Sequence, residues 1–168
     1  KEVAREMTVK AGQKCTAIRR AIVPRRHLDA VAQALAARLA KTVVGDPAVE
    51  GVRMGALASH AQVADVAAKV ARLREGAEVV YDGGPGFAPV GPGTAQGAFF
   101  APTLLACAKP FDADVVHEVE AFGPVSTLMP YDDLDEALTL AAKGQGSLVG
   151  TLVTRDPATA AKAVPVAA

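Results

Sequence analysis

The side chain best suited to covalent chemistry in this sequence is a cysteine that follows a glycine closely. Residues 12–16 read Gly-Gln-Lys-Cys-Thr, and a run rich in branched apolar residues comes after them. Cysteine is a good nucleophile only as a thiolate, which nearby cations, helix ends and hydrogen-bond donors favour. Lys14 is adjacent to Cys15, and Arg19 and Arg20 are close in sequence. The backbone N–H of Cys15 can also donate to an oxyanion that develops on a substrate carbonyl.

The alternative for Cys15 is a structural role, because free cysteine is among the residues most often buried. By sequence position alone, burial is the favoured interpretation. Cys107 provides a comparison, since it lies in the apolar run Leu-Leu-Ala-Cys-Ala at 104–108, without glycine or polar neighbours. We predict that Cys107 is structural.

Three histidines are available as a base for a cysteine nucleophile. His27 and His60 lie near predicted helix starts, and His117 precedes Glu118. We predict a surface position for each histidine, and a pair between Cys15 and His117 stays open. With two cysteines and no Cys-x-x-Cys or paired-histidine spacing, the sequence indicates neither a disulfide framework nor a metal site.

A second segment with chemical potential reads Glu-Ala-Phe-Gly-Pro at residues 120–124. Its Gly-Pro end predicts a tight bend that holds the Glu120 carboxylate and the Phe122 ring close together. Such a ring can support a flat heterocycle while the carboxylate accepts a hydrogen bond from a ribose hydroxyl. The alternative is a capped turn with Phe122 in the core and Glu118 and Glu120 in water, and the segment alone favours that alternative.

The elements that must position these segments alternate between helices and strands. Apolar spacing and capping residues predict helices over residues 1–11, 25–41, 59–74, 132–143 and from 156 onward. Branched and apolar runs predict strands or extended segments over residues 17–23, 78–81, 99–105, 125–131 and 148–153. The alternation predicts an α/β fold with a partly parallel sheet flanked by helices, and we find no repeat or second domain.

Residues 83–97 are rich in glycine and proline, which predicts a connecting loop. A phosphate-binding fingerprint is rejected there, because its glycines must open a helix directly after a strand. The segment that follows, at 99–105, reads as extended instead.

Composition narrows the class of protein. Eighteen basic and eighteen acidic residues cancel, so the chain lacks the basic surface typical of nucleic-acid or anionic-membrane binding. Charges interrupt every apolar stretch, and no signal peptide is recognisable, so we expect a cytoplasmic, reducing compartment. The chain starts without Met inside a predicted helix and ends in an apolar tail, so we expect a piece of a longer protein.

Together, the two motifs resemble those of the NAD(P)-dependent aldehyde dehydrogenase superfamily. Residues 12–15 resemble its Gly-Gln-x-Cys nucleophile motif, and residues 120–124 resemble its Glu-x-Phe-Gly-Pro motif, in the same order. Residues 10–20 are most similar to the aldehyde dehydrogenase part of the bifunctional ring-opening proteins of phenylacetate degradation. Other similar segments, which extend the resemblance over nearly the whole chain, lie at 45–47, 54–57, 102–105 and 151–156.

The resemblance implies that residues 1–168 are a partial catalytic (thiol) domain. Cys15 would attack an aldehyde carbonyl and carry a thioester, with NADP or NAD as the hydride acceptor. Glu120 would hold the nicotinamide ribose, with Phe122 beside it, and Gln62 would fall near the cofactor without an assigned role. The family's cofactor-binding domain, its oxyanion asparagine and its water-activating glutamate lie outside this chain, so we expect the fragment alone to be inactive.

The narrower resemblance implies a small-molecule substrate, a CoA-linked semialdehyde, and a parent protein with a fused hydratase-type domain that forms a homo-oligomer. Two alternatives stay open. Coenzyme A, rather than water, could take the acyl group from Cys15. The chain could also be a non-catalytic structural module with an inert thiol.

Overall fold

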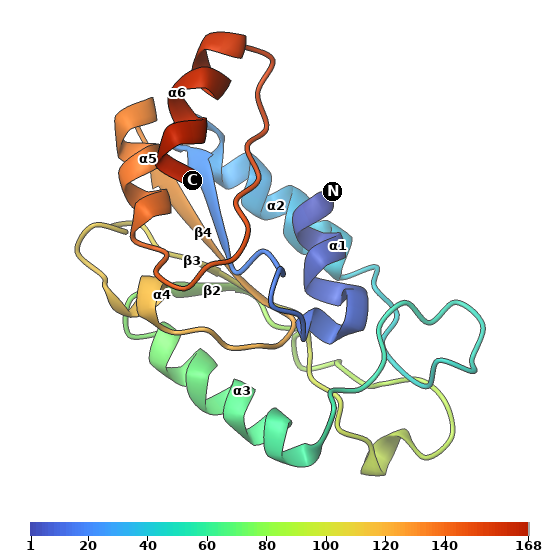
Figure 1. Cartoon of the computed structure of the whole chain (residues 1–168). Coiled ribbons are helices and arrows are strands. Elements are labelled where there is room, and N and C mark those ends of the chain that lie inside the picture. Colours follow the sequence, from blue (N-terminus) through green and yellow to red (C-terminus); the bar gives the residue numbers. More distant parts are fainter. Residues whose placement is uncertain (168) are drawn as a thin grey trace.

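The computed structural model describes residues 1–167, of which 166 and 167 are described by their backbone alone. Its centre is a four-stranded mixed sheet with the order β1-β4-β3-β2 (Figure 1). The central strand β4 runs parallel to both β1 and β3, whereas β2 is antiparallel to β3. The strands are β1 (Arg20–Pro24), β2 (Glu78–Tyr81), β3 (Thr103–Ala106) and β4 (Val125–Tyr131). The predicted α/β class with a partly parallel sheet is confirmed.

Helices cover both faces of this sheet, as Figure 1 shows. The α-helices are α1 (Glu2–Thr8), α2 (Leu28–Leu39), α3 (His60–Leu73), α4 (Val115–Glu118), α5 (Leu134–Ala142) and α6 (Pro157–Ala167). Short 3₁₀ turns follow α1, precede α2 and interrupt the glycine-rich loop, at η1 (Val9–Gly12), η2 (Arg25–His27) and η3 (Thr94–Gln96). The predicted loop over residues 83–97 therefore contains one short 3₁₀ helix, together with hydrogen-bonded turns and a single bridge from Val90 to Gly45.

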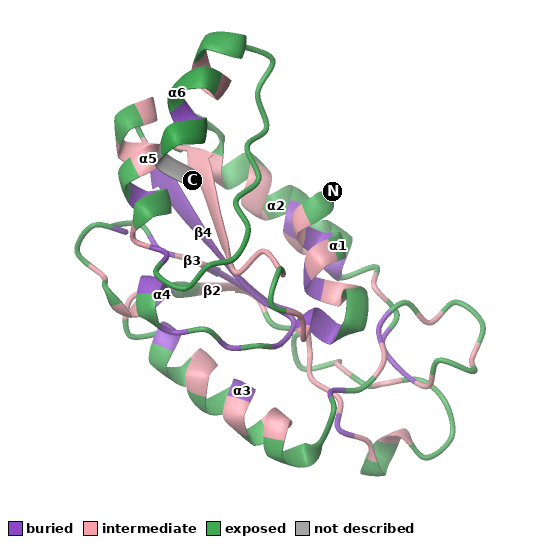
Figure 2. Cartoon of the chain, in the orientation of Figure 1, coloured by how far each residue is buried: buried purple, intermediate pink, exposed green. Residues whose placement is uncertain are grey.

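The core has two halves because successive side chains of a strand point to opposite faces of the sheet. In β4, Val125 and Met129 pack in the cluster that also contains Val66 of α3. Leu128 packs in the other cluster, with Met7 of α1 and Leu39 of α2. Strand β4 is buried along almost its whole length (Figure 2).

Capping residues fix the starts of two helices near the positions that the sequence predicts. The Ser59 hydroxyl accepts from the Gln62 N–H (3.2 Å) at the start of α3, and the Asp133 carboxylate accepts from the Glu136 N–H (2.9 Å) at the start of α5. Such caps satisfy backbone donors that the first helical turn leaves unpaired. The Ser59 cap also fixes where the segment before α3 must turn, which matters for the site below.

The strand predicted over residues 148–153 is wrong. These residues form no strand in the described part of the chain, and the side chains of Leu148 and Val153 are 70% and 92% exposed. Figure 2 shows the segment before α6 as an exposed trace. A strand requires a neighbouring strand to satisfy its backbone groups, and these residues are paired with none in the described sheet, so their branched composition is not sufficient.

Candidate active site

The backbone that leads to Cys15 follows an unusual path. Lys10 and Ala11 have φ of 52° and 50°, and Gly12 has φ of 69°. The left-handed region costs a non-glycine residue roughly 1–2 kcal/mol, so the surrounding structure must hold Lys10 and Ala11 in it. The predicted helix over residues 1–11 accordingly ends earlier, at Thr8. This turn redirects the chain away from α1 just before the cysteine.

Two tight turns then present the cysteine. Gln13 (φ −82°, ψ 68°) is the central residue of an inverse γ-turn, in which the Lys14 N–H donates to the Gly12 carbonyl (2.9 Å). The Ala17 N–H donates to the Lys14 carbonyl (3.1 Å), which puts Cys15 at the tip of the next turn. Among residues 1–167, the Cys15 N–H donates to no acceptor. The turn therefore leaves this N–H available for a ligand.

The two cysteines lie in opposite environments. Cys15 is exposed, so the interpretation of Cys15 as a buried structural residue is wrong. Cys107 is 1% exposed, which confirms its predicted structural role, and burial raises the pKa of its thiol. In the structure, Cys15 is therefore the accessible thiol of the two.

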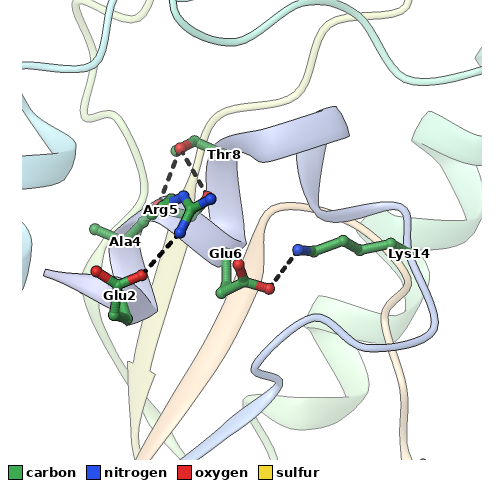
Figure 3. A network of polar contacts seen from close by, with 6 residues as sticks. All are labelled: Glu2, Ala4, Arg5, Glu6, Thr8 and Lys14. Carbon is green, nitrogen blue, oxygen red and sulfur yellow. Dashed lines mark hydrogen bonds and ion pairs between the residues drawn. The ribbon is translucent and has the colours of Figure 1, made fainter. Parts of the chain in front are cut away.

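The cations near Cys15 in sequence bind other groups. Lys14 forms an ion pair with Glu6 of α1 (Figure 3). Arg19 donates to the Ser147 hydroxyl (3.1 Å), and Arg20 donates to the carbonyls that end α5. Although these cations are close to Cys15 in sequence, they therefore do not act on its thiol as we expected. The Lys14–Glu6 pair instead anchors residues 12–17, the Cys15 turn, to α1.

His117 is buried, so its predicted surface position is wrong. It is 4% exposed, and burial is the main cause that lowers its pKa. Its Nδ1 accepts from Arg20 (2.9 Å) and its Nε2–H donates to the Pro110 carbonyl (2.7 Å), because Arg20 can only donate and a carbonyl can only accept. Since both ring nitrogens are engaged, a Cys15–His117 pair is excluded. The buried ring of His117 thus links β1 to the segment before α4.

The other two histidines lie at the surface, as predicted. His27 is exposed at the start of α2, and His60 is exposed at the start of α3. The His60 Nε2 is hydrogen-bonded to the Gln96 carbonyl (3.0 Å), which connects α3 to the glycine-rich loop.

The second motif forms a bend with Phe122 on its outside. Phe122 has φ of 52° and is 38% exposed, so the alternative that places its ring in the core is wrong. Glu120 is also exposed, whereas Gly123 and Pro124 are buried. The Val125 N–H donates to the Gly123 carbonyl (2.7 Å), which tightens the bend directly before β4. The predicted tight bend is confirmed.

The two motifs are in direct contact through their glycines. A Cβ atom added to Gly12 would lie 2.1 Å from the Gly123 carbonyl oxygen, far inside van der Waals contact. A Cβ atom on Gly123 would in turn lie 2.8 Å from the Val66 side chain of α3. Only glycine permits backbones to approach so closely. Residues far apart in the sequence therefore meet at one place, which the sequence motifs alone did not establish.

An open depression of about 760 Å³ lies at this contact. It is lined by three segments: the left-handed turn after α1, the residues that lead into α3, and the bend at Phe122. Its lining residues are Lys10, Ala11, Gln13, Gly55, Ala56, Ala58, Ser59, Gln62 and Phe122. Cys15 and Glu120 are exposed close by in sequence but do not line it.

Gln13 connects two walls of the depression. Its Oε1 accepts from the Ala58 N–H (2.8 Å), and its Nε2 donates to Gln62 Oε1 (3.1 Å). Sequence reasoning missed residues 55–58 as part of the site and gave Gln62 no role. The signal that could have found them is the Met-Gly-Ala-Leu segment at 54–57 together with the Ser59 cap.

The described residues contain neither a candidate metal site nor a candidate membrane span. Among residues 1–167, no group of three His, Cys, Asp or Glu side chains is placed to hold a metal ion. In the same residues, no helix has both the length and the apolar character that a membrane crossing requires.

Comparison with known proteins identifies relatives along almost the whole chain. The chain is 48% identical over 165 residues to 3,4-dehydroadipyl-CoA semialdehyde dehydrogenase from Aromatoleum evansii, covering 98% of this chain and 32% of that protein. It is 51% identical over 102 residues to Protein MaoC from Klebsiella aerogenes, covering 60% and 29% of the two chains. The chain thus spans about a third of the length of these curated relatives.

Solved structures agree in fold. Betaine aldehyde dehydrogenase from Staphylococcus aureus, in complex with NAD⁺, superposes with a TM-score of 0.82 at 25% identity, covering 99% of this chain and 32% of that one. A mutant of aldehyde dehydrogenase C from Pseudomonas syringae, complexed with NAD⁺ and octanal, gives 0.70 at 32% identity over 84% of this chain and 28% of that one. A model of the aldehyde dehydrogenase family matches residues 1–166. The chain therefore belongs to the aldehyde dehydrogenase family.

Proposed function

We propose that this chain is the thiol-bearing part of the catalytic domain of a longer NAD(P)-dependent aldehyde dehydrogenase, with Cys15 as its nucleophile. The observation that carries the proposal is the contact between Gly12 and Gly123, which joins the Cys15 turn to the bend at Phe122. The cofactor-binding domain is then expected elsewhere in the parent protein. This expectation agrees with the length of the relatives, of which the chain covers about a third.

The chemistry proposed for Cys15 follows from its position at the tip of a turn. Its thiolate adds to the aldehyde carbonyl carbon, a C–S bond forms, and the carbonyl electron pair moves to oxygen. The Cys15 N–H, which has no acceptor among residues 1–167, can donate to that oxyanion. After hydride loss, the acyl group stays on sulfur as a thioester, and water releases it as the acid while the thiol is restored.

The residues at the depression suit a nicotinamide cofactor. Phe122 offers a partly exposed ring, and Ser59 and Gln62 supply polar groups from the start of α3. We propose that Phe122 packs beside the nicotinamide and that the exposed Glu120 carboxylate accepts from a ribose hydroxyl. When bound, NAD or NADP supplies the acceptor for the hydride that leaves the substrate carbon. The NAD⁺ complexes of similar structures support this proposal.

The substrate proposed is a CoA-linked semialdehyde. It follows from the name of the Aromatoleum evansii relative, 3,4-dehydroadipyl-CoA semialdehyde dehydrogenase. We further propose that the parent protein is cytoplasmic and homo-oligomeric. The balanced charge of the chain suits a protein without a nucleic-acid or membrane partner.

The decisive experiment removes the thiol from the whole protein that contains this chain. Cys15→Ala is expected to lower aldehyde-dependent NAD(P)H formation by at least about a thousandfold, because a covalent nucleophile has no substitute in the site. Cys107→Ala, the matched control, removes a buried thiol and should keep the reaction. Activity retained by Cys15→Ala would refute the proposal.

Analysis of the product separates hydrolysis from acyl transfer to coenzyme A. If water takes the acyl group from Cys15, the terminal aldehyde becomes a carboxylate. If coenzyme A takes it, the product carries a new thioester instead. Mass spectrometry of the product, with and without added coenzyme A, distinguishes the two.

A further inference from the structure

The side chain of Gln13 uses both ends of its amide within the depression. Because the Ala58 N–H can only donate, the atom that faces it at 2.8 Å must be the oxygen of Gln13. The Gln13 nitrogen then faces Gln62 and donates to its Oε1 at 3.1 Å. The backbone of Ala58 thus fixes the orientation of the Gln13 amide.

These two bonds link the Cys15 turn to structure that is remote in sequence. The hydrogen bonds within the turn are local, between Lys14 and Gly12 and between Ala17 and Lys14. The Lys14–Glu6 ion pair reaches only the adjacent helix α1. Among the hydrogen bonds of residues 12–15 in the described structure, those of Gln13 alone reach the segment before α3 and α3 itself.

Backbone packing makes a second contact with the turn. Gly12 lies against the Gly123 carbonyl, and Gly123 lies against Val66 of α3. Helix α3 therefore supports the turn twice, indirectly through Gly123 and directly through Gln62. Each of the two Gln13 hydrogen bonds requires its own distance and angle, so together they define the position of this side chain.

We propose that Gln13 is a positioning residue for Cys15, which acts by tying the Cys15 turn to Ala58 and Gln62 across the depression. The inference rests on the proposed function and deepens it. Gln13 touches no reacting atom in this account. It holds Cys15 so that the sulfur faces the carbonyl carbon of the substrate while the Cys15 N–H faces the carbonyl oxygen. Small misplacements of such groups can lower the rate by about a hundredfold.

The test compares two Gln13 variants in the whole protein. Gln13→Met keeps the length of the side chain but makes neither hydrogen bond. Gln13→Glu still accepts from the Ala58 N–H, and its second oxygen can accept from Gln62 when that amide turns over. We expect Gln13→Met to lower kcat for aldehyde oxidation by about thirty- to a hundredfold with little change in KM, and Gln13→Glu to stay within about fivefold of wild type. Gln33→Met, on the exposed face of α2, is the matched control.

A cofactor-free measurement separates positioning from exposure. 4-Nitrophenyl acetate acylates a thiolate through an oxyanion and releases nitrophenolate, whereas iodoacetamide alkylates it by displacing iodide without one. We expect Gln13→Met to slow the acylation of Cys15 by at least about tenfold and to leave its alkylation within about threefold. Equal slowing of both reactions would contradict the positioning role.

Each outcome assigns the failure to one proposal. If Gln13→Met keeps kcat within about twofold while Cys15→Ala abolishes activity, the positioning role is wrong and the proposed function stands. If Cys15→Ala also keeps activity, the proposed function is wrong. Should Gln13→Met not fold, Gln13→Asn replaces it, because the shorter amide cannot reach both partners, and the same loss of kcat is expected.

Discussion

The turn that carries Cys15 and the strand that leads to Cys107 show two ways in which this chain places the same side chain. Strand β3 is hydrogen-bonded on both sides, and its leucines, Leu104 and Leu105, are fully buried. The Cys107 N–H continues this regular pairing by donating to the Leu128 carbonyl (2.9 Å). Cys107 is consequently part of the core and its thiol is covered.

The Cys15 turn is built instead from irregular backbone. Lys10, Ala11 and Gly12 have positive φ, and the turn is held by Gln13 and by the contact with Gly123. Here the regular pairing continues into a buried position at Cys107, whereas a turn that is held by other segments can be both exposed and fixed. The difference teaches that the path of the backbone makes the Cys15 thiol accessible to solvent. The neighbouring cations add nothing to this, because they bind other groups.

For the comparison of the two cysteines, the largest expected effect is a difference in thiol reactivity. In the native protein, we expect Cys15 to react with iodoacetamide at least about a hundredfold faster than Cys107, because Cys107 must wait for an opening of the core. Burial also raises the pKa of Cys107 and so reduces its thiolate. Peptide mass spectrometry over time measures both rates in one sample. In urea the two rates should converge, and a native ratio near one would break the comparison.

A substitution at Gly12 tests the contact that holds the turn. Gly12→Ala should lower the free energy of unfolding by about 3 kcal/mol, because its Cβ would clash with the Gly123 carbonyl and its φ of 69° is unfavourable. Gly93 has a similar φ of 72° with no atom within 4 Å of an added Cβ. Gly93→Ala should therefore cost only about 1 kcal/mol. Urea unfolding measures both, and equal costs would show that the contact is unimportant.

The buried His117, which links Arg20 to the Pro110 carbonyl, should make the free energy of unfolding depend on pH. Because burial lowers the pKa of folded His117 below that of the unfolded chain, the folded state favours the neutral ring. The stability that this gives is complete above about pH 6.5, the unfolded value, and is lost as the pH falls below it through the folded pKa. Urea unfolding between pH 7.5 and 5.5 should show this loss.

The neighbours of His117 define the controls. Asp114, Glu118 and Lys143 share its cavity with Gln145. The ion pair with Lys143 lowers the pKa of Asp114. His117→Gln can keep an acceptor for Arg20 and a donor for the Pro110 carbonyl without titrating. It should reduce the pH dependence, while His27→Gln at the surface should not. The same pH dependence in both variants would contradict the assignment.

The smallest expected effect concerns two hydroxyls within the sheet. Thr103 Oγ1 donates to the Ala101 carbonyl (3.1 Å), whereas the buried Ser126 Oγ has no partner among residues 1–167. Thr103→Val should cost about 1 kcal/mol of unfolding free energy, and Ser126→Ala should change it by less than about 0.5 kcal/mol. Urea titrations at neutral pH measure the pair. A larger cost for Ser126→Ala would indicate an unrecognised partner in the core.

Patterns that are local in the sequence predicted much of the fold. Residues 78–81 and 125–131 form strands as predicted, and Ser59 caps α3. Strand β1 begins at Arg20, later than predicted, since residues 15–17 belong to the Cys15 turn. These predictions succeed because periodicity and capping depend on neighbours within a few residues. The strand predicted over residues 148–153 was wrong because a strand also needs a partner strand, which composition does not specify.

For the site, the sequence by itself determined the chemical groups: a cysteine after Gly-Gln and a bend at Phe-Gly-Pro. That Cys15 and Phe122 are exposed was decided by the structure, since the sequence favoured burial of both. Only the tertiary structure decided that Gly12 meets Gly123 and that Gln13 binds Ala58 and Gln62. It also decided that His117 is buried and accepts a hydrogen bond from Arg20. The physical reason is the distance along the sequence over which each kind of interaction acts. Backbone propensity acts between adjacent residues, whereas these contacts join segments that lie far apart in sequence and exist only once the helices have packed on the sheet.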